Sequence, residues 1–186
     1  MSDAARRRSA RRTLLALVLV GLLPFAGSWL LYWLWEPDAR VNYGELITPL
    51  PLADTRAPAE LRDLRGKWVF LTVDSGACDK HCRRKLYAMR QVRLTQGQNM
   101  ERIERAWIID DATLPLAQLT AEYAGTRIVQ AQGSDLLSKL PVATALRDHI
   151  YLIDPLGNVM LRYPRDADPS RMKKDLTRLL KASRIG

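Results

Sequence analysis

The sequence predicts an α/β domain with a mostly parallel sheet, preceded by one transmembrane helix, and three observations indicate this fold class. The first is an uncharged, apolar run at residues 13–35 that is long enough to cross a bilayer. The second is an alternation of short apolar runs with amphipathic stretches, which is typical of buried parallel strands joined by helices. The third is a cysteine pair, Cys78 and Cys82, at the junction of one such run with the stretch that follows it. At 186 residues the chain allows one ordinary domain and a tail.

The N-terminal segment is predicted to be a basic tail followed by a membrane span. Residues 1–12 contain five arginines and form the expected cytoplasmic tail. Residues 13–35 would span about 34 Å as a helix, since each residue adds ~1.5 Å. Tryptophan and tyrosine gather at the far end of this run, as in an interfacial aromatic belt, and the arginines mark its near end as cytoplasmic. A signal peptide cleaved near residues 26–28 is the alternative.

This topology predicts a single-pass protein of the bacterial inner (cytoplasmic) membrane, with its C-terminal domain in the periplasm or another extracytoplasmic space. Such compartments are oxidising, so a working dithiol there implies a reductant partner for the cysteine pair. The net charge of +9 is partly explained by the tail, and no long basic stripe is interleaved with aromatic residues. We therefore expect no nucleic-acid partner.

A linker and an entry segment are predicted at residues 36–60, which are rich in proline, and the folded domain is predicted at residues 61–186. Residues 42–47 suit either a short edge strand or a stretch that packs on the domain, and we expect packing. A first strand, nearly continuously apolar and so buried on both faces, is expected at residues 68–73. The small residues that follow it are expected to bring Cys78 to the surface.

The centre of the domain is predicted to hold a helix, a strand and a second helix. After Cys82 an apolar stripe indicates a helix with basic residues on its opposite side; the stripe is Leu86, Met89 and Val92. A second buried strand is expected at residues 103–110. Asp110 and Asp111 at its end suggest a metal site, although such residues more often cap a following helix. That helix is expected at residues 113–123, with Pro115 in its first turn.

The last part of the domain is predicted to add strands and a closing helix. Short strands are expected at residues 126–129, 149–153 and 159–163, with a short helix or turn at residues 135–140. Asp154 to Asn158 has the composition of a tight turn, so the last two strands should form a hairpin. Asp168 and Pro169 are typical of a helix start. The buried face of this helix is expected to be Met172, Leu176, Leu179 and Leu180.

Strand, thiol pair and helix in this order are the active-site layout of a thioredoxin-like domain, so the whole pattern predicts a thioredoxin-like α/β/α sandwich. A cysteine at a helix start has its thiolate favoured by the positive end of the helix dipole. Cysteines at positions i and i+4 can close a disulfide or chelate one soft metal ion. The alternative is a buried pair with a structural role alone.

The cysteine motif and a second motif resemble those of a known family. Cys78-x-x-x-Cys82 after an apolar strand, with Asp148-His149-Ile150-Tyr151-Leu152-Ile153-Asp154-Pro155-x-Gly157 downstream, resembles the Sco/SenC copper chaperones. Those are membrane-anchored thioredoxin-fold proteins that help to build the copper centre of cytochrome c oxidase. The resemblance covers residues 41–183. It implies copper binding by Cys78, Cys82 and His149, and it also implies that the two cysteines can act as a dithiol.

Two positions depart from the family pattern. Asp79 stands where the family usually has proline. The family histidine aligns without a gap near Leu146, so His149 takes its role only with a deletion of about three residues. Two thiolates and an imidazole suit copper, and zinc would fit with a fourth ligand. Otherwise His149 is a strand-end histidine satisfied by a neighbouring carboxylate, and His81 either tunes the thiols or faces solvent.

Three functions remain open at this point. The first is an assembly factor that delivers copper to a respiratory oxidase subunit, or reduces the cysteines of its copper site. The second is a general extracytoplasmic thiol–disulfide oxidoreductase, in which Cys78 attacks the disulfide of another thiol protein and Cys82 resolves the mixed disulfide. The third is a scaffold with a thioredoxin-like fold that binds a partner without redox chemistry.

Overall fold

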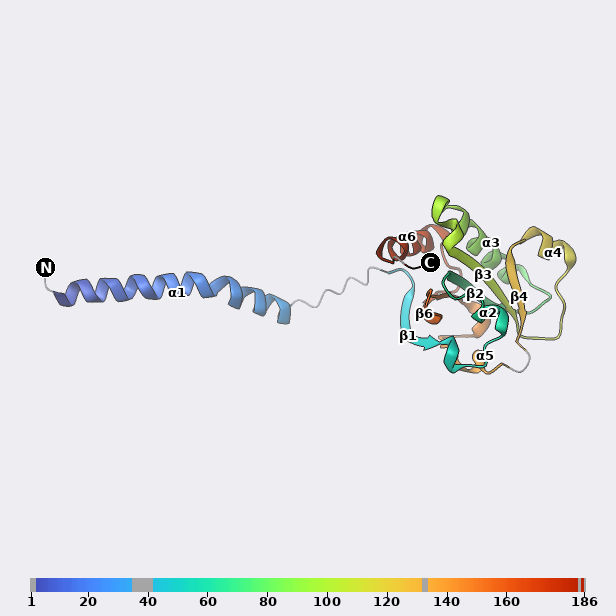
Figure 1. Cartoon of the computed structure of the whole chain (residues 1–186), viewed down its shortest axis with the longest axis horizontal. Coiled ribbons are helices and arrows are strands. Elements are labelled where there is room, and N and C mark those ends of the chain that lie inside the picture. Colours follow the sequence, from blue (N-terminus) through green and yellow to red (C-terminus); the bar gives the residue numbers. More distant parts are fainter. Residues whose placement is uncertain (1–2, 35–41, 132–133, 184, 186) are drawn as a thin grey trace. The chain divides into compact units, whose positions relative to one another are not determined.

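The computed structural model describes residues 3–34, 42–131, 134–183 and 185, and its contacts divide the chain into two units, Met1–Val41 and Asn42–Gly186 (Figure 1). The first unit contains one long helix, α1 (Asp3–Leu34). Its stretch Arg11–Leu34 is long and apolar enough to cross a membrane, which fits an anchor or a signal sequence. Residues 1–2 of the expected tail, Trp35 of the expected span and residues 36–41 of the expected linker lie outside the described residues.

The second unit is built on one six-stranded sheet with the order β1-β6-β5-β2-β3-β4. The strands are β1 (Glu45–Pro51), β2 (Trp68–Asp74), β3 (Ile103–Ile109), β4 (Thr126–Gln130), β5 (Ile150–Ile153) and β6 (Asn158–Tyr163). Strands β2, β3 and β4 run parallel, whereas β5 is antiparallel to β2 and to β6. This sheet, with helices on both faces, is the thioredoxin-like fold that the sequence predicted, but it is mixed and not mostly parallel, since β1, β5 and β6 pair antiparallel (Figure 1).

Helices cover both faces of the sheet, and the pleat of each strand divides its side chains between two apolar cores. One core lies under α3 (Lys80–Leu94), α4 (Ala117–Glu122) and α6 (Pro169–Ala182). The other lies under η1 (Leu52–Asp54), α2 (Ala59–Arg62) and α5 (Leu136–Lys139). In β2, Phe70 belongs to the first core and Leu71 to the second, because successive strand side chains point to opposite faces. Two further 3₁₀ helices are η2 (Gly97–Arg102) and η3 (Leu146–Asp148).

Helix α6 begins as the sequence predicted and joins the entry segment to the domain. The Asp168 carboxylate accepts a hydrogen bond from Ser170 N at 2.8 Å, and a proline occupies the first turn. On the inner face Met172, Leu176 and Leu180 are buried and Leu179 is half-buried. Asp175 is also buried there, and it accepts hydrogen bonds from Tyr43 N and Gly44 N at 3.0 and 2.8 Å. The chain is therefore fastened to α6 where it enters the domain.

The entry segment forms a strand, so the expectation that it only packs on the domain was wrong. From Glu45 onward it pairs antiparallel with β6, and Leu46 lies opposite Leu161 in the register. The strand includes Pro49 and Pro51. Because β1 is at the edge of the sheet, a missing N–H there removes no necessary ladder hydrogen bond.

The helix expected at residues 113–123 is shorter than predicted, since α4 begins only at Ala117. Leu116 precedes it with an extended backbone, at φ −63° and ψ 135°. Pro115 disfavours helical geometry in the residue before it, so the chain stays non-helical through this region. The non-helical segment passes beside the cysteine loop, where the Thr113 backbone packs against Gly76.

Candidate active site

The two cysteines are joined in a disulfide at the junction of β2 with α3. Their Cα atoms are 5.1 Å apart, and Cys82 is the third residue of α3. Cys82 is fully buried and Cys78 is only 2% exposed, so the expectation that the loop brings Cys78 to the surface was wrong. Both sulfurs belong to the core under α3 and α6. A disulfide sulfur carries no charge and packs as an apolar atom, which explains its place there.

A tight loop turns the chain from the end of β2 toward the first cysteine. Cys78 N donates to Ser75 O at 3.0 Å, and Cys78 itself has φ +45°. That left-handed conformation costs a non-glycine residue roughly 1–2 kcal/mol. Gly76 fits only as glycine, because a Cβ built there would lie 1.8 Å from Thr113 O. The loop is thus strained at Cys78, and its Gly76 packs closely against the Thr113 backbone.

Asp111 fastens this loop to the segment that follows β3. Its Oδ1 accepts hydrogen bonds from Gly76 N at 3.1 Å and Thr113 N at 3.0 Å. Hydrogen bonds, first from the Ser75 side chain and then from Gly76 N, lower the pKa of Asp111 to about 2. The expectation that the acidic pair caps a helix was wrong for this residue, since the next helix begins only at Ala117.

Asp79 is the N-cap of α3 and stands between the two cysteines in the sequence. Its Oδ1 accepts a hydrogen bond from Cys82 N at 2.9 Å, and this bond is the main cause that lowers the pKa of Asp79. The carboxylate therefore places a negative charge at the helix end that was expected to favour a thiolate. The helix dipole and this charge act on the sulfurs in opposite directions.

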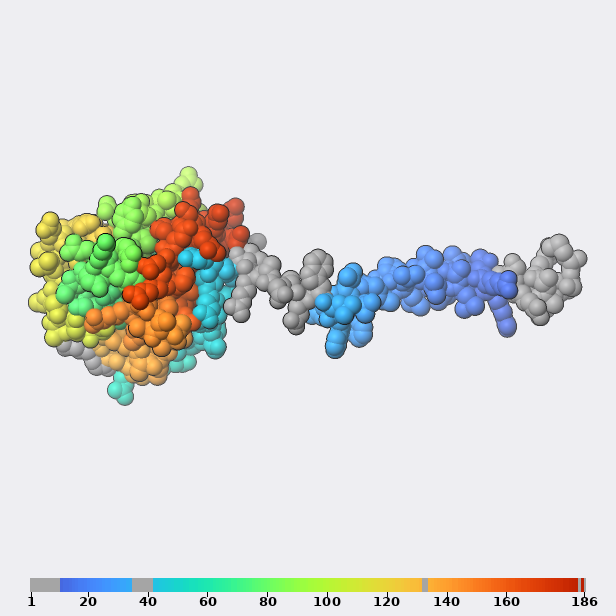
Figure 2. Space-filling model, turned by 180° about the vertical axis from the view of Figure 1, so that it is seen from behind, coloured from blue at the N-terminus to red at the C-terminus, as the bar shows by residue number. Residues whose placement is uncertain are grey.

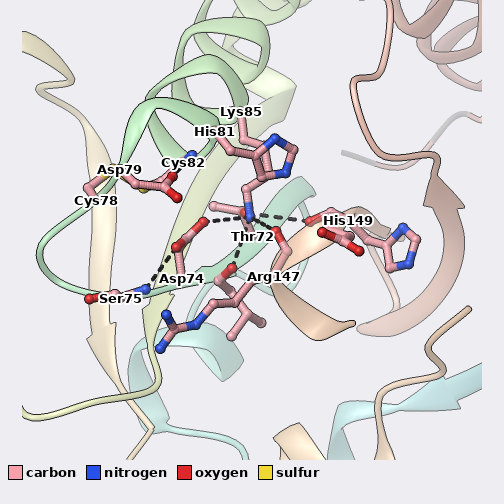
Figure 3. A network of polar contacts seen from close by, with 12 residues as sticks. Thr72, Asp74, Ser75, Cys78, Asp79, His81, Cys82, Lys85, Arg147 and His149 are labelled. Atoms are coloured by element: carbon pink, nitrogen blue, oxygen red, sulfur yellow. Dashed lines mark hydrogen bonds and ion pairs between the residues drawn. A yellow bond between two sulfur atoms is a disulfide. The ribbon is translucent and has the colours of Figure 1, made fainter. Parts of the chain in front are cut away.

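A buried ion pair lies beneath the motif, and sequence reasoning missed it. Lys85 Nζ is 2.8 Å from Asp74 Oδ2 and donates to Val73 O at 3.0 Å and to Arg147 O (Figure 3). Burial lowers the pKa of Lys85, and the nearby Asp74 charge opposes that effect. A signal was present in the sequence, because Lys85 precedes Met89 by four residues and so continues the apolar stripe of the helix.

Arg147 connects this network to the end of β3. Its guanidinium makes a bidentate contact with Asp110, with Nη2–Oδ1 at 2.7 Å and Nε–Oδ2 at 2.8 Å. The hydrogen bond that Arg147 donates to Asp110 is the main cause that raises the pKa of Arg147. Asp110 therefore forms an ion pair in this structure and does not cap a helix. The end of β2, α3 and η3 are linked through Lys85 and Arg147.

His149 lies on the other face of the sheet from the disulfide. Its ring packs edge-on against Tyr151, with centroids 6.0 Å apart, and Tyr151 belongs to the core under α2 and α5. Its Nδ1 is 3.0 Å from Tyr163 O, and a carbonyl oxygen only accepts, so Nδ1 carries the proton. Burial lowers the pKa of His149, which keeps the imidazole neutral at pH 7. The expected carboxylate partner is replaced by a backbone carbonyl.

The structure does not bring the three expected metal ligands together. Figure 3 shows the His149 ring directed away from the two cysteines. It borders a separate cavity of about 310 Å³, shared with Tyr43, Glu45 and Arg162. Within residues 3–34, 42–131, 134–183 and 185, no three His, Cys, Asp or Glu side chains are grouped closely enough to hold a metal ion. The two sulfurs fit a soft cation once reduced, whereas His149 as the third ligand stays a prediction.

His81, inside the motif, is mostly buried and does not simply face solvent. Its side chain is 12% exposed, and its Nδ1 lies 3.6 Å from Asp166 Oδ1 and 3.4 Å from an Arg84 guanidinium nitrogen. The ring borders a cavity of about 360 Å³ that also contacts Ala88 and Ile150. The Asp166 carboxylate also forms an ion pair with Arg84 at 2.8 Å.

Comparison with known proteins gives one family and a set of related folds. Residues 68–183 match the family model described as transmembrane-like, thioredoxin-like, C-terminal domain. No curated protein sequence matches the chain.

Among solved structures, apo Sco1 from Thermus thermophilus superposes with a TM-score of 0.54 and 16% identity, covering 76% of this chain and 99% of that one. Yeast Sco1 superposes with a TM-score of 0.53 and 14% identity, covering 66% of this chain and 85% of that one. Copper-bound yeast Sco1 superposes with a TM-score of 0.51 and 15% identity, covering 66% of this chain and 84% of that one. At these identities the similarity shows the fold alone.

Proposed function

Because this chain belongs to the transmembrane-like, thioredoxin-like family, we propose that it is a membrane-anchored thiol–disulfide oxidoreductase that reduces disulfides in extracytoplasmic proteins. One observation carries the proposal: Cys78 and Cys82 are already joined at the start of α3, beside a strained loop. A cysteine pair at a strand-to-helix junction can exchange between dithiol and disulfide.

The reaction proceeds through a mixed disulfide and transfers two electrons. The Cys78 thiolate attacks one sulfur of the target disulfide, so that a Cys78–target bond forms and the other target sulfur leaves as a thiolate. Cys82 then loses its proton and attacks Cys78, which releases the second target sulfur as a thiolate and leaves the Cys78–Cys82 disulfide. The oxidised pair is the product of this cycle. A dithiol reductant must return two electrons and two protons before the next cycle.

The proposed target is a respiratory oxidase subunit, in which the cysteines of a copper site must be reduced before they bind metal. The support is the motif resemblance to Sco/SenC proteins together with the likeness of the fold to Sco1. Other extracytoplasmic thiol proteins have the same chemistry and are the alternative targets. In the scaffold alternative, a partner only binds the domain and no thiol–disulfide exchange takes place.

Copper delivery is a second candidate, favoured by the likeness of the fold to copper-bound yeast Sco1. Copper would then be cargo, held by the reduced Cys78 and Cys82, because two thiolates suit Cu(I). His149 would have to cross from the opposite face of the sheet to join them.

The proposed location is the bacterial inner membrane, with the domain in the periplasm. The support is the helix Arg11–Leu34, which is preceded by an arginine-rich sequence. By the positive-inside rule, those arginines favour a cytoplasmic N-terminus.

The test uses the reduced, full-length protein in a neutral detergent, mixed with a protein that carries an accessible disulfide. With Cys82→Ser, we expect the mixed disulfide to accumulate through Cys78, because nothing resolves it. Cys78→Ser should give no such adduct. If neither variant forms an adduct and wild-type protein reduces nothing, the oxidoreductase proposal fails. An anaerobic Cu(I) titration of the same samples tests copper delivery, which requires binding that both cysteine variants lose.

A further inference from the structure

The exposed side of α3 forms one continuous stripe that begins at the cysteine motif. Lys80, Arg83, Arg84 and Tyr87 are spaced so that they share one face of the helix, and all four are exposed. Tyr87 is 52% exposed and so presents a large aromatic ring to solvent. Figure 2 shows the α3 segment, in green, on the surface beside α6, in red. A partner that reaches the cysteines along α3 would meet this stripe.

The stripe carries a positive charge that the domain does not neutralise. Every charged residue of α3 is basic: Lys80, Arg83, Arg84, Lys85, Arg90 and Arg93. Lys85 is buried with Asp74, and Arg84 is paired with Asp166, so these two are neutralised. Within the described part of the chain, Lys80 and Arg83 form no ion pair. Arg83 Nε lies 3.4 Å from Cys78 O, which places one of these charges directly at the reactive cysteine.

An apolar surface lies on the other side of the same loop. Residues 112–116 run beside it, because Asp111 holds Gly76 and Thr113 together and Gly76 packs on the Thr113 backbone. Two leucines of this segment are strongly exposed, Leu114 at 76% and Leu116 at 63%. Single exposed leucines are common, but two on a segment fixed to the cysteine loop form a ready contact surface.

We propose that Lys80, Arg83, Tyr87, Leu114 and Leu116 form a docking site for an acidic polypeptide segment that carries a bulky apolar side chain close to its disulfide. This inference rests on the proposed function and names the chemistry of its target. Opposite charges steer the encounter and set its orientation, while the leucines and the tyrosine give the apolar contacts that hold it. Because Cys78 is only 2% exposed, a target sulfur reaches it only when the surrounding surface is closely engaged.

The experiment measures exchange between the reduced, full-length protein in neutral detergent and synthetic peptides that contain one disulfide. The peptides differ only in their flanking residues, which are acidic, neutral or basic, each with and without a leucine next to the cysteine. We expect the acidic leucine peptide to react at least about tenfold faster than its basic counterpart at low salt. The ratio should fall below about twofold in 1 M salt, because exposed charges are then screened.

Matched variants separate the docking site from general electrostatics. Lys80→Glu with Arg83→Glu should abolish or invert the acidic-to-basic ratio. Lys173→Glu with Lys174→Glu makes the same change of net charge on the exposed face of α6 and should leave the ratio unchanged. Leu114→Ser with Leu116→Ser should remove the faster exchange of the leucine peptides while keeping the preference for peptides with acidic flanking residues.

Two outcomes distinguish the possible failures. Equal rates for acidic and basic peptides at low salt would overturn this inference while leaving the oxidoreductase intact. The same conclusion follows if the charge preference survives Lys80→Glu with Arg83→Glu. No exchange with any peptide would instead overturn the proposed function itself.

Discussion

The disulfide and His149 lie near the same end of the sheet, yet they belong to opposite faces. In the register of β2 with β5, Thr72 lies opposite Ile150, so the residues after Thr72 and the residue before Ile150 are close along the strands. Ile150 points into the core that holds the two sulfurs, and its neighbour His149 therefore points the other way. Proximity along the backbone is not enough to build a site, since the pleat decides which side chains meet.

The two regions also differ in what their surroundings allow. The disulfide lies beside a strained loop and a capping carboxylate, and a buried lysine follows Cys82 by three residues in α3. His149 is held in one tautomer by Tyr163 O and packs against Tyr151. The first region is suited to chemistry, and the second is suited to structure. The predictions that follow test this contrast.

The largest expected effect is loss of exchange when the resolving sulfur is removed. Cys82→Ser should abolish turnover with disulfide substrates, because the mixed disulfide on Cys78 then has no internal thiolate to release it. Turnover of a disulfide-containing peptide, followed as released thiol, measures this. A Cys82→Ser protein that still turned over at the wild-type rate would show that Cys82 does not resolve the mixed disulfide.

The buried ion pair should have the largest effect on stability. Lys85→Met leaves the Asp74 carboxylate buried without its partner, which costs about 3–5 kcal/mol. Denaturant unfolding of the domain measures this cost. As a control, Lys139→Met breaks an exposed pair with Asp135 and should cost less than about 1 kcal/mol. Equal effects of the two variants would mean that Lys85 is not held in the interior.

His149→Ala should separate stability from thiol chemistry. The variant loses a buried hydrogen bond and leaves a small void, which we expect to cost about 1–3 kcal/mol. Exchange with peptide disulfides should stay within about twofold of wild type, since the imidazole lies across the sheet. An anaerobic Cu(I) titration adds the decisive comparison. A more than tenfold loss of affinity would show that the chain rearranges to bring His149 to the sulfurs.

Removal of the charge on the capping carboxylate should change the pKa of the reactive thiol. Asp79→Asn keeps an oxygen that can accept from Cys82 N but removes the negative charge near the sulfurs. We expect the pKa of the reactive thiol to fall, because its thiolate is no longer repelled. The pH dependence of alkylation measures this shift. Asp168→Asn makes the same change at the cap of α6 and should not alter the thiols.

The sequence predicted most of the fold because its signals were local. Mostly apolar runs located β2 and β3, and Asp168 with Pro169 located the start of α6. The errors arose where tertiary contacts decide. Edge pairing with β6 made a strand of a proline-rich segment. Pro115, together with the contact of the Thr113 backbone with Gly76, kept residues 113–116 out of the predicted helix.

The candidate site was predicted in part for the same reason. The cysteine pair was visible as a motif, and Lys85 could have been recognised from its place in the apolar stripe. The orientation of the His149 side chain could not be predicted, because it depends on which face of the sheet each residue occupies at the start of β5. Sequence reasoning began the strand at His149, one residue before β5 starts.

The smallest expected effect is a loss of stability at acidic pH, through the hydrogen bonds that Asp111 accepts from the loop before Cys78. The pKa of Asp111 is lowered to about 2 in the folded protein, against an ordinary value of 3.8, because the Ser75 side chain and Gly76 N bind the ionised form. A lowered pKa means that the stabilisation is complete above the ordinary value and is lost as pH falls toward 2. Asp111→Asn keeps an acceptor oxygen but does not titrate, so wild type should lose its advantage over this variant between about pH 4 and pH 2. Unfolding midpoints measured across that interval would contradict the assignment if the difference between the two proteins stayed constant.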